Sequence, residues 1–120
     1  MDIVNIAQNI QEKIKTLELG RELLKERAEE KAEAIANYEK QIALTLIKLK
    51  NGVEFELDGE KIVNPLGSVL EKIAKGICYK EKLSMELAEA QYKNVIVGMA
   101  AMQAELNGYQ SIFRHLEERS

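Results

Sequence analysis

The chain has 120 residues, of which 46% are hydrophobic and 31% charged, while only 5% are aromatic. This composition is typical of long helices or coiled coils, and the length fits one domain. The net charge of −3 argues against a general attraction to nucleic acid or to an anionic membrane. A single cysteine excludes an intrachain disulfide, and the chain begins without the basic and apolar regions of a signal peptide. We therefore expect a cytoplasmic protein that does not cross a membrane.

Residues 2–50 carry one helical pattern. Positions spaced alternately by four and three residues, from Ile3 to Leu49, are mostly apolar, which is the spacing of a coiled-coil seam. Arg21 and Lys31 interrupt this seam. The pair Asn51-Gly52 is expected to end the helix, because glycine suits the left-handed position that follows a helix.

The period then changes from helical to alternating. Val53, Phe55 and Leu57 alternate with glutamates before an Asp-Gly pair, which is a strong signal for a β-hairpin with a two-residue turn. We expect the hairpin over residues 53–63, with Phe55 opposite Ile62 and Glu56 opposite Lys61. An isolated two-stranded hairpin is marginally stable, so its apolar face should rest on another part of the chain.

A second helix is predicted over residues 65–118. Asn64 is suited to the N-cap and Pro65 to the first turn, while a capping box formed by Ser68 and Glu71 is an alternative start. Its apolar positions form two runs that are out of phase by one residue. We therefore expect a bend between residues 76 and 84.

Two long helices joined by a short β tip should fold back antiparallel. The expected fold is mainly α: one domain over residues 1–120, built as a coiled-coil-like helical hairpin with a two-stranded β-hairpin at its tip. If Lys50 and Pro65 lie level, Leu17 is near Gly98 and Ile42 is near Ile73.

The segment Asn94–Ile112 is nearly uncharged, with Glu105 as its one charged residue. A solvated helix keeps a charged face, so this segment should be covered on more than one side. A two-helix hairpin buries only one stripe of each helix, which favours a homodimer with a four-helix arrangement at the end that carries the termini. A compact monomeric bundle is the rival.

No catalytic, metal-binding or cofactor-binding residues are predicted, and the chain is not expected to be an enzyme. Cys78 and His115 are the only thiol and imidazole, and they lie far apart on the predicted helix. The Glu-x-x-His motif of di-metal bundles is absent, because Ile112 stands three residues before His115. Gly98 and Gly108 are more consistent with close helix contacts than with phosphate binding.

Two groups of residues are candidates for binding. The apolar side chains of the β tip are expected either to serve only as a connector or to dock on a partner; these are Val53, Phe55, Leu57 and Ile62. The polar side chains of the charge-poor helix, with two neighbours, are expected to form a structural hydrogen-bond network or to line a ligand site; these are Asn9, Gln103, Glu105, Asn107, Tyr109, Gln110 and Arg114.

The order of a heptad helix, the tip Lys-Asn-Gly-Val-Glu-Phe-Glu-Leu-Asp-Gly-Glu and a second heptad helix resembles small helical proteins of bacteriophages and prophages. It is most similar to host-nuclease inhibitors of the Gam type, although this chain is shorter and acidic, which argues against DNA-end binding. The resemblance implies a non-enzymatic accessory protein that inhibits or modulates a host nuclease or defence complex. The expected partners are a second copy of the chain and a host or phage protein. The alternatives are a protein that sequesters a small molecule such as a nucleotide signal, and a DNA-binding helical hairpin.

Overall fold

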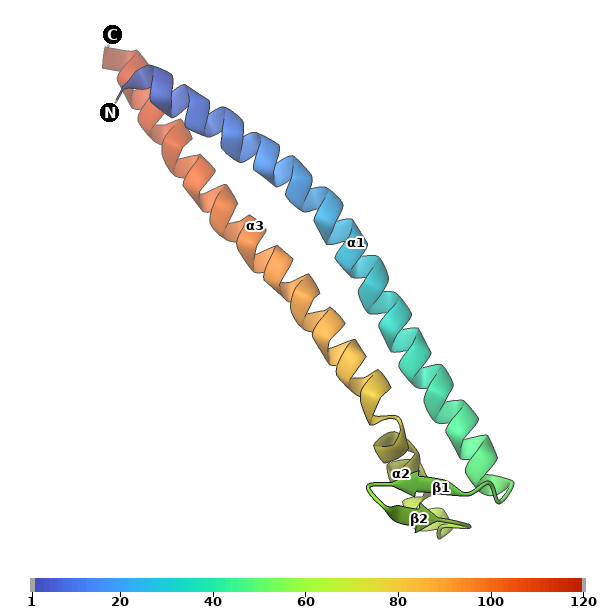
Figure 1. Ribbon diagram of the computed structural model, residues 1–120. Coiled ribbons are helices and arrows are strands. Elements are labelled where there is room, and N and C mark those ends of the chain that lie inside the picture. Colours follow the sequence, from blue (N-terminus) through green and yellow to red (C-terminus); the bar gives the residue numbers. More distant parts are fainter. Residues whose placement is uncertain (1, 120) are drawn as a thin grey trace. The chain divides into compact units, whose positions relative to one another are not determined.

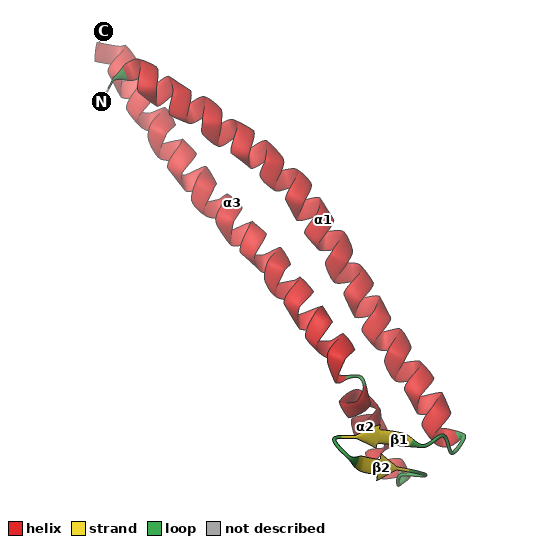
Figure 2. Cartoon of the chain, in the orientation of Figure 1, coloured by secondary structure: helices red, strands yellow, loops and turns green. Residues whose placement is uncertain are grey.

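The computed structural model describes residues 2–119 and is mainly α-helical (Figure 1). Helix α1 spans Ile3–Lys50 and helix α3 spans Tyr79–Arg119, and the two run antiparallel. Between them lie strands β1 (Phe55–Leu57) and β2 (Glu60–Ile62), a 3₁₀ turn (Gly67–Val69) and the short helix α2 (Leu70–Ile77), as Figure 2 shows. The predicted fold, a helical hairpin with a short β-hairpin between its helices, is confirmed.

The chain divides into two units. Unit 1 combines Met1–Ala28 with Gln91–Ser120, and unit 2 comprises Glu29–Ala90. Buried apolar side chains lie in both units. They are Ile6, Leu17 and Leu106 in unit 1 and Leu49, Ala74, Cys78 and Ala88 in unit 2.

Both ends of α1 are capped by local interactions. The Val4 backbone N–H donates to the Asp2 carboxylate at 3.3 Å, so Asp2 is the N-cap. At the other end, the Gly52 N–H donates to the Leu49 carbonyl at 3.2 Å and the Val53 N–H donates to the Lys48 carbonyl at 3.0 Å. These two bonds form a Schellman motif, and Gly52 has the left-handed φ of 78° that this motif needs. The predicted end of the first helix is confirmed.

The β-hairpin has the predicted register, with Phe55 opposite Ile62 and Glu56 opposite Lys61. Its turn is formed by Asp58 and Gly59, whose φ values of 49° and 82° are those of a type I′ turn. The apolar face rests on α2, where a Leu57 methyl group lies 3.6 Å from the place that a β-carbon on Gly76 would occupy. Unit 2 therefore supplies the support that an isolated hairpin lacks.

The second helical segment begins later than predicted. Asn64 is not an N-cap, because it has a left-handed φ of 48°, and Leu66 is extended at φ −58° and ψ 141°. The proline at position 65 disfavours a right-handed helical conformation for the residue before it, and asparagine tolerates the left-handed alternative. The Ser68 capping box is also wrong, since neither the 3₁₀ turn nor α2 has a side-chain cap. Regular α-helix starts at Leu70 rather than at Pro65.

The predicted bend is confirmed at a single residue. Helix α2 ends at Ile77, Cys78 has φ −88° and ψ 27°, and α3 begins at Tyr79. The backbone bonds from Cys78 to Ala74 and from Lys82 to Cys78, both 3.1 Å, continue across the break. The break absorbs the one-residue slip between the two apolar runs, so that Ala74 and Ala88 are both buried.

The register of the helix pair differs in part from the predicted one. In unit 1 Gly20 lies against Met99, and Leu17 and Gly98, which the prediction placed near each other, line one cavity. In unit 2 the Thr45 hydroxyl lies 3.4 Å from the Cys78 sulfur, where Ile42 was expected near Ile73.

Candidate interaction surfaces

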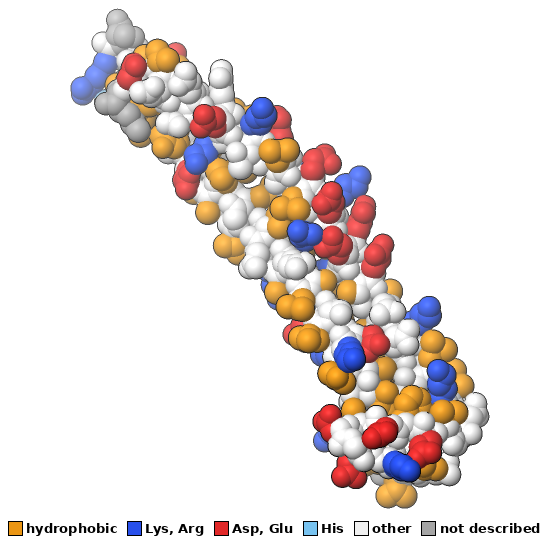
Figure 3. Space-filling view, in the orientation of Figure 1, with side chains coloured by type: hydrophobic (Ala, Val, Ile, Leu, Met, Phe, Trp, Pro, Cys, Tyr) orange, Lys and Arg blue, Asp and Glu red, His pale blue; other side chains and the backbone are white. Residues whose placement is uncertain are grey.

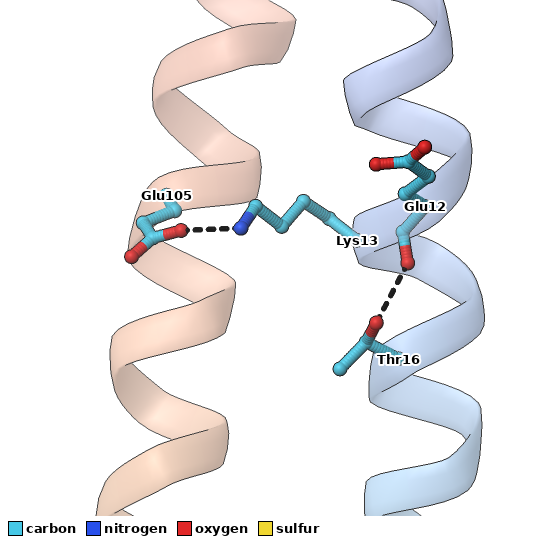
Figure 4. Close-up of polar contacts among 4 residues, drawn as sticks. All are labelled: Glu12, Lys13, Thr16 and Glu105. Carbon is cyan, nitrogen blue, oxygen red and sulfur yellow. Dashed lines mark hydrogen bonds and ion pairs between the residues drawn. The ribbon is translucent and has the colours of Figure 1, made fainter.

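An ion pair joins the two helices of unit 1. The Lys13 ammonium lies 2.7 Å from the Glu105 carboxylate, and on α1 the Thr16 hydroxyl donates to the Glu12 carbonyl at 2.9 Å (Figure 4). The hydrogen bond from Lys13 to Glu105 raises the pKa of the lysine, although burial acts in the opposite direction. Glu105 thus has a structural role between α3 and α1.

The structure divides the predicted polar cluster of α3. The Gln103 amide donates to the Asn107 side-chain oxygen at 3.0 Å on the exposed surface of the helix, and this pair does not involve α1. Tyr109 lines a shallow notch of about 340 Å³ together with Glu105, Gly108 and Ile112. The structure therefore splits these polar side chains between different places on unit 1.

Two members of the cluster meet at an open cleft. Gln110 and Arg114 of α3, with Phe113, face Ala7, Ile10 and Gln11 of α1 across a cavity of about 580 Å³. Asn9, which the prediction grouped with them, does not line it. The cleft offers a guanidinium, two amides and an aromatic ring to a ligand of suitable shape.

A second cavity, called here the apolar groove, has a volume of about 370 Å³. It is lined by Thr16, Leu17, Gly20 and Leu23 of α1 and by Asn94, Val95, Gly98, Met99 and Met102 of α3. Of these residues, the sequence analysis singled out Gly98 for a close helix contact, but it did not find the α1 side. The α1 side could not be found because the sequence did not give the register of the two helices.

Within the single chain, Gly98 and Gly108 do not make the close helix contacts that the sequence suggested. A β-carbon at either position would meet nothing within 4 Å. Gly20 makes the close contact instead, because a β-carbon there would lie 3.1 Å from Met99 Cγ. Arg21, which the predicted seam turned toward the other helix, is exposed as a result.

The β tip divides its apolar residues between the interior and the surface. Phe55, Leu57 and Ile62 are half-buried, and Leu57 rests on α2, whereas Val53 is 42% exposed. Other apolar side chains near the hairpin are exposed and were missed. We define the tip surface as Val53, Val63, Leu66 and Val69, of which Leu66 is the most exposed at 76%.

Acidic side chains are also exposed at the tip, and Figure 3 shows several over the hairpin. They are Glu54, Glu56, Asp58 and Glu60, all exposed, and the nearest cation of the hairpin, Lys61, lies 3.9 Å from Glu54. The tip therefore carries exposed apolar side chains together with these four acidic ones, which we call the acidic rim.

Neither a metal cluster nor a membrane span is found among residues 2–119. The described part of the chain has no group of three or more His, Cys, Asp or Glu side chains placed to hold an ion. Cys78 is buried in unit 2, and His115 is exposed on α3 in unit 1. Over the same residues, no helix is long and apolar enough to cross a membrane.

Comparisons of the chain with protein-family models, with curated proteins and with solved structures each gave no match. The resemblance to Gam-type inhibitors accordingly stays a prediction from the layout of the sequence.

Proposed function

We propose that this chain is a non-enzymatic accessory protein that works as a homo-oligomer and binds another protein through its tip surface. The observation that carries the proposal is the exposure of Leu66 and its neighbours beside a rigidly built hairpin. Large apolar side chains that are exposed near polar ones are characteristic of a protein-binding site.

The tip surface is held in place before any partner arrives. The Schellman motif after α1, the type I′ turn and the packing of Leu57 on α2 fix the segment that carries Val53 and Val63. A preorganised surface loses little conformational entropy on binding, which favours affinity. The four acidic residues of the rim favour a partner with a basic surface, since complementary charges speed association and select the partner.

Because the sequence layout resembles that of Gam-type inhibitors, we propose that this partner is a host protein complex. On this proposal the chain inhibits or modulates a nuclease or defence complex by covering a basic surface with its tip. DNA binding, the alternative for a helical hairpin, is disfavoured by the net charge of −3 and by the acidic rim.

The test is affinity capture from a bacterial lysate with the full chain and with two matched variants. Leu66→Glu should reduce recovery of the captured protein at least about tenfold, because it places a charge at the centre of an apolar contact. Leu87→Glu makes the same change at an exposed position on α3 and should leave recovery unchanged. Equal capture by all three chains, or no specific capture by the unmodified chain, would contradict the proposal.

A second candidate function is small-molecule binding in the cleft of unit 1. It is supported by the convergence of Arg114, Gln110 and Phe113 with Gln11 at one cavity, a set that suits an anionic, aromatic ligand such as a nucleotide. A nucleotide that binds there should raise the melting temperature of the chain. The rise should vanish in Arg114→Ala, and a panel of nucleotides without any effect would exclude this function.

A further inference from the structure

We propose that the cleft of unit 1 selects a nucleoside monophosphate over both the free nucleoside and the triphosphate. The inference rests on the second candidate function, nucleotide binding in this cleft, and assigns each part of the ligand to a part of the site. The base lies against the apolar side chains, the two glutamine amides contact its edge, and the single phosphate pairs with Arg114.

Both helices contribute residues with the same spacing to the cleft. These residues are Ala7, Ile10 and Gln11 of α1 and Gln110, Phe113 and Arg114 of α3. Residues three and four positions apart lie on one face of a helix, so each set forms one wall of the cleft. The cleft volume of about 580 Å³ lies within the range of roughly 300–1,000 Å³ that is usual for small-molecule pockets.

The apolar side chains of the cleft are less exposed than the polar ones at its mouth. Ala7, Ile10 and Phe113 are half-buried, whereas Gln11 and Arg114 are exposed. A planar ring that enters the cleft therefore contacts apolar side chains and the aromatic ring of Phe113, while the polar part of the same ligand stays near water. This division suits a molecule with an aromatic base at one end and an anionic group at the other.

The two glutamines favour a ring that carries polar atoms on its edge. Gln110 is half-buried on α3 and Gln11 is exposed on α1. Within residues 2–119, neither amide side chain hydrogen-bonds to another residue. An amide offers donors and an acceptor side by side, and the edges of nucleobases present complementary groups. A nucleobase therefore fits the cleft better than a hydrocarbon ring does.

Arg114 is the one charged residue among the described residues that line the cleft. Its guanidinium forms no ion pair or hydrogen bond with any other residue in the range 2–119. A guanidinium binds a phosphate through two parallel hydrogen bonds, which are stronger than hydrogen bonds between neutral groups. A nucleoside has no phosphate and loses this contact, so it should bind more weakly than the monophosphate.

The charges near Arg114 disfavour a longer chain of phosphates. Glu117 and Glu118 follow Arg114 by three and four residues, which places them beside it on α3. Lys13 of α1, two residues after Gln11, is already bound to the Glu105 carboxylate at 2.7 Å (Figure 4). One guanidinium is therefore left to balance the ligand, and additional phosphates would be repelled by the neighbouring carboxylates.

The first experiment measures dissociation constants by isothermal titration calorimetry with the full chain at fixed ionic strength. The probes are the monophosphates of adenosine, guanosine, cytidine and uridine, followed by the nucleoside and the triphosphate of the base that binds best. At least one monophosphate should bind. Its nucleoside and its triphosphate should each have a dissociation constant at least about tenfold higher.

The second experiment tests the place of the phosphate. Arg114→Gln should weaken binding of the monophosphate at least about tenfold and leave binding of the nucleoside unchanged, because only the phosphate contact is lost. Arg114→Lys keeps the charge without the paired hydrogen bonds and should have an intermediate affinity. The control is Arg119→Gln, which removes a positive charge from an exposed position of α3 outside the cleft and should bind like the unmodified chain.

The third experiment tests the place of the base. Phe113→Leu should weaken the monophosphate and the nucleoside by the same factor, at least about fivefold, because stacking on the aromatic ring is lost for both ligands. Circular dichroism of every variant checks that the helices persist.

The outcomes separate this inference from the proposed functions. If none of the four monophosphates binds, both the inference and nucleotide binding in the cleft are overturned, while capture through the tip surface is unaffected. A triphosphate that binds as tightly as the monophosphate would overturn the selectivity and leave nucleotide binding intact. Equal weakening of the nucleoside and the monophosphate in Arg114→Gln would overturn the assignment of the phosphate to Arg114.

Discussion

At the residue scale, single residues of the tip adopt backbone conformations on which the turns of unit 2 depend. Gly52 and Gly59 have the positive φ values that glycine adopts without strain, and Asp58 and Asn64 have similar values that aspartate and asparagine tolerate. The conformations of the Asn-Gly and Asp-Gly pairs could be predicted because these residue pairs favour few backbone conformations. Asn64 was misread because asparagine suits both an N-cap and a left-handed turn, and the proline after it decides between them.

The turn glycine gives a prediction at this scale. Gly59→Ala should lower the free energy of unfolding by about 1–2 kcal/mol, because a β-carbon is strained at a φ of 82°. Gly67→Ala is the control, since Gly67 lacks a positive φ and a β-carbon there meets nothing within 4 Å. Its effect should stay within about 0.5 kcal/mol. Urea unfolding followed by circular dichroism at fixed protein concentration measures both, and equal stabilities would contradict the turn geometry.

At the scale of helix packing, the sequence pattern predicted the correct kind of contact, a seam between two helices, but misplaced some of its residues. The heptad spacing of α1 predicted a seam, and Leu17 lies in it, but the seam passes through Gly20 rather than Arg21. The spacing of apolar residues alone does not decide which of two adjacent positions, Gly20 or Arg21, faces the other helix. The packing of Met99 into the space over Gly20 selects between them.

The contact between Gly20 and Met99 gives a prediction for the helix pair of unit 1. Gly20→Leu should destabilise the chain by about 1–3 kcal/mol, because the larger side chain overfills the space that Met99 occupies. Gly20→Ala should be nearly neutral, since a helix-propensity gain of about 1 kcal/mol is offset by the shift forced on Met99. Thermal and urea unfolding test both variants. A leucine variant as stable as the unmodified chain would show that the helices do not approach closely at this point.

At the scale of the whole molecule, the main feature is apolar surface that a single chain does not cover. The charge-poor segment Asn94–Ile112 was predicted to be covered on more than one side, yet several of its apolar side chains, Val97 among them, are exposed in the chain. The tip surface is a second such area in unit 2. The proposals assign different occupants to different places, another protein to the tip surface and a nucleoside monophosphate to the cleft of unit 1. The variants Leu66→Glu and Arg114→Gln separate them because each touches only one.

The candidate site was less predictable than the fold for a physical reason. Gln103 and Asn107 were correctly placed on one helix, but they hydrogen-bond to each other on its exposed surface. Gln110 and Arg114 do meet, at the cleft, because they are four residues apart beside Phe113. Leu66 was missed because a leucine inside a predicted helix is expected to be buried, and only the late start of α2 leaves it exposed.

The sequence alone determined the elements whose causes are local: the long heptad helices, the Schellman end of α1, the Asp-Gly hairpin with its register and the bend near Cys78. Each depends on side-chain periodicity or on the backbone preferences of one or two residues. The tertiary structure decided the level at which the helices face each other, the choice of Gly20 at the contact and the exposure of Leu66 and Val97. These depend on packing between residues distant in the chain, where a displacement by a few positions preserves the pattern but changes every contact.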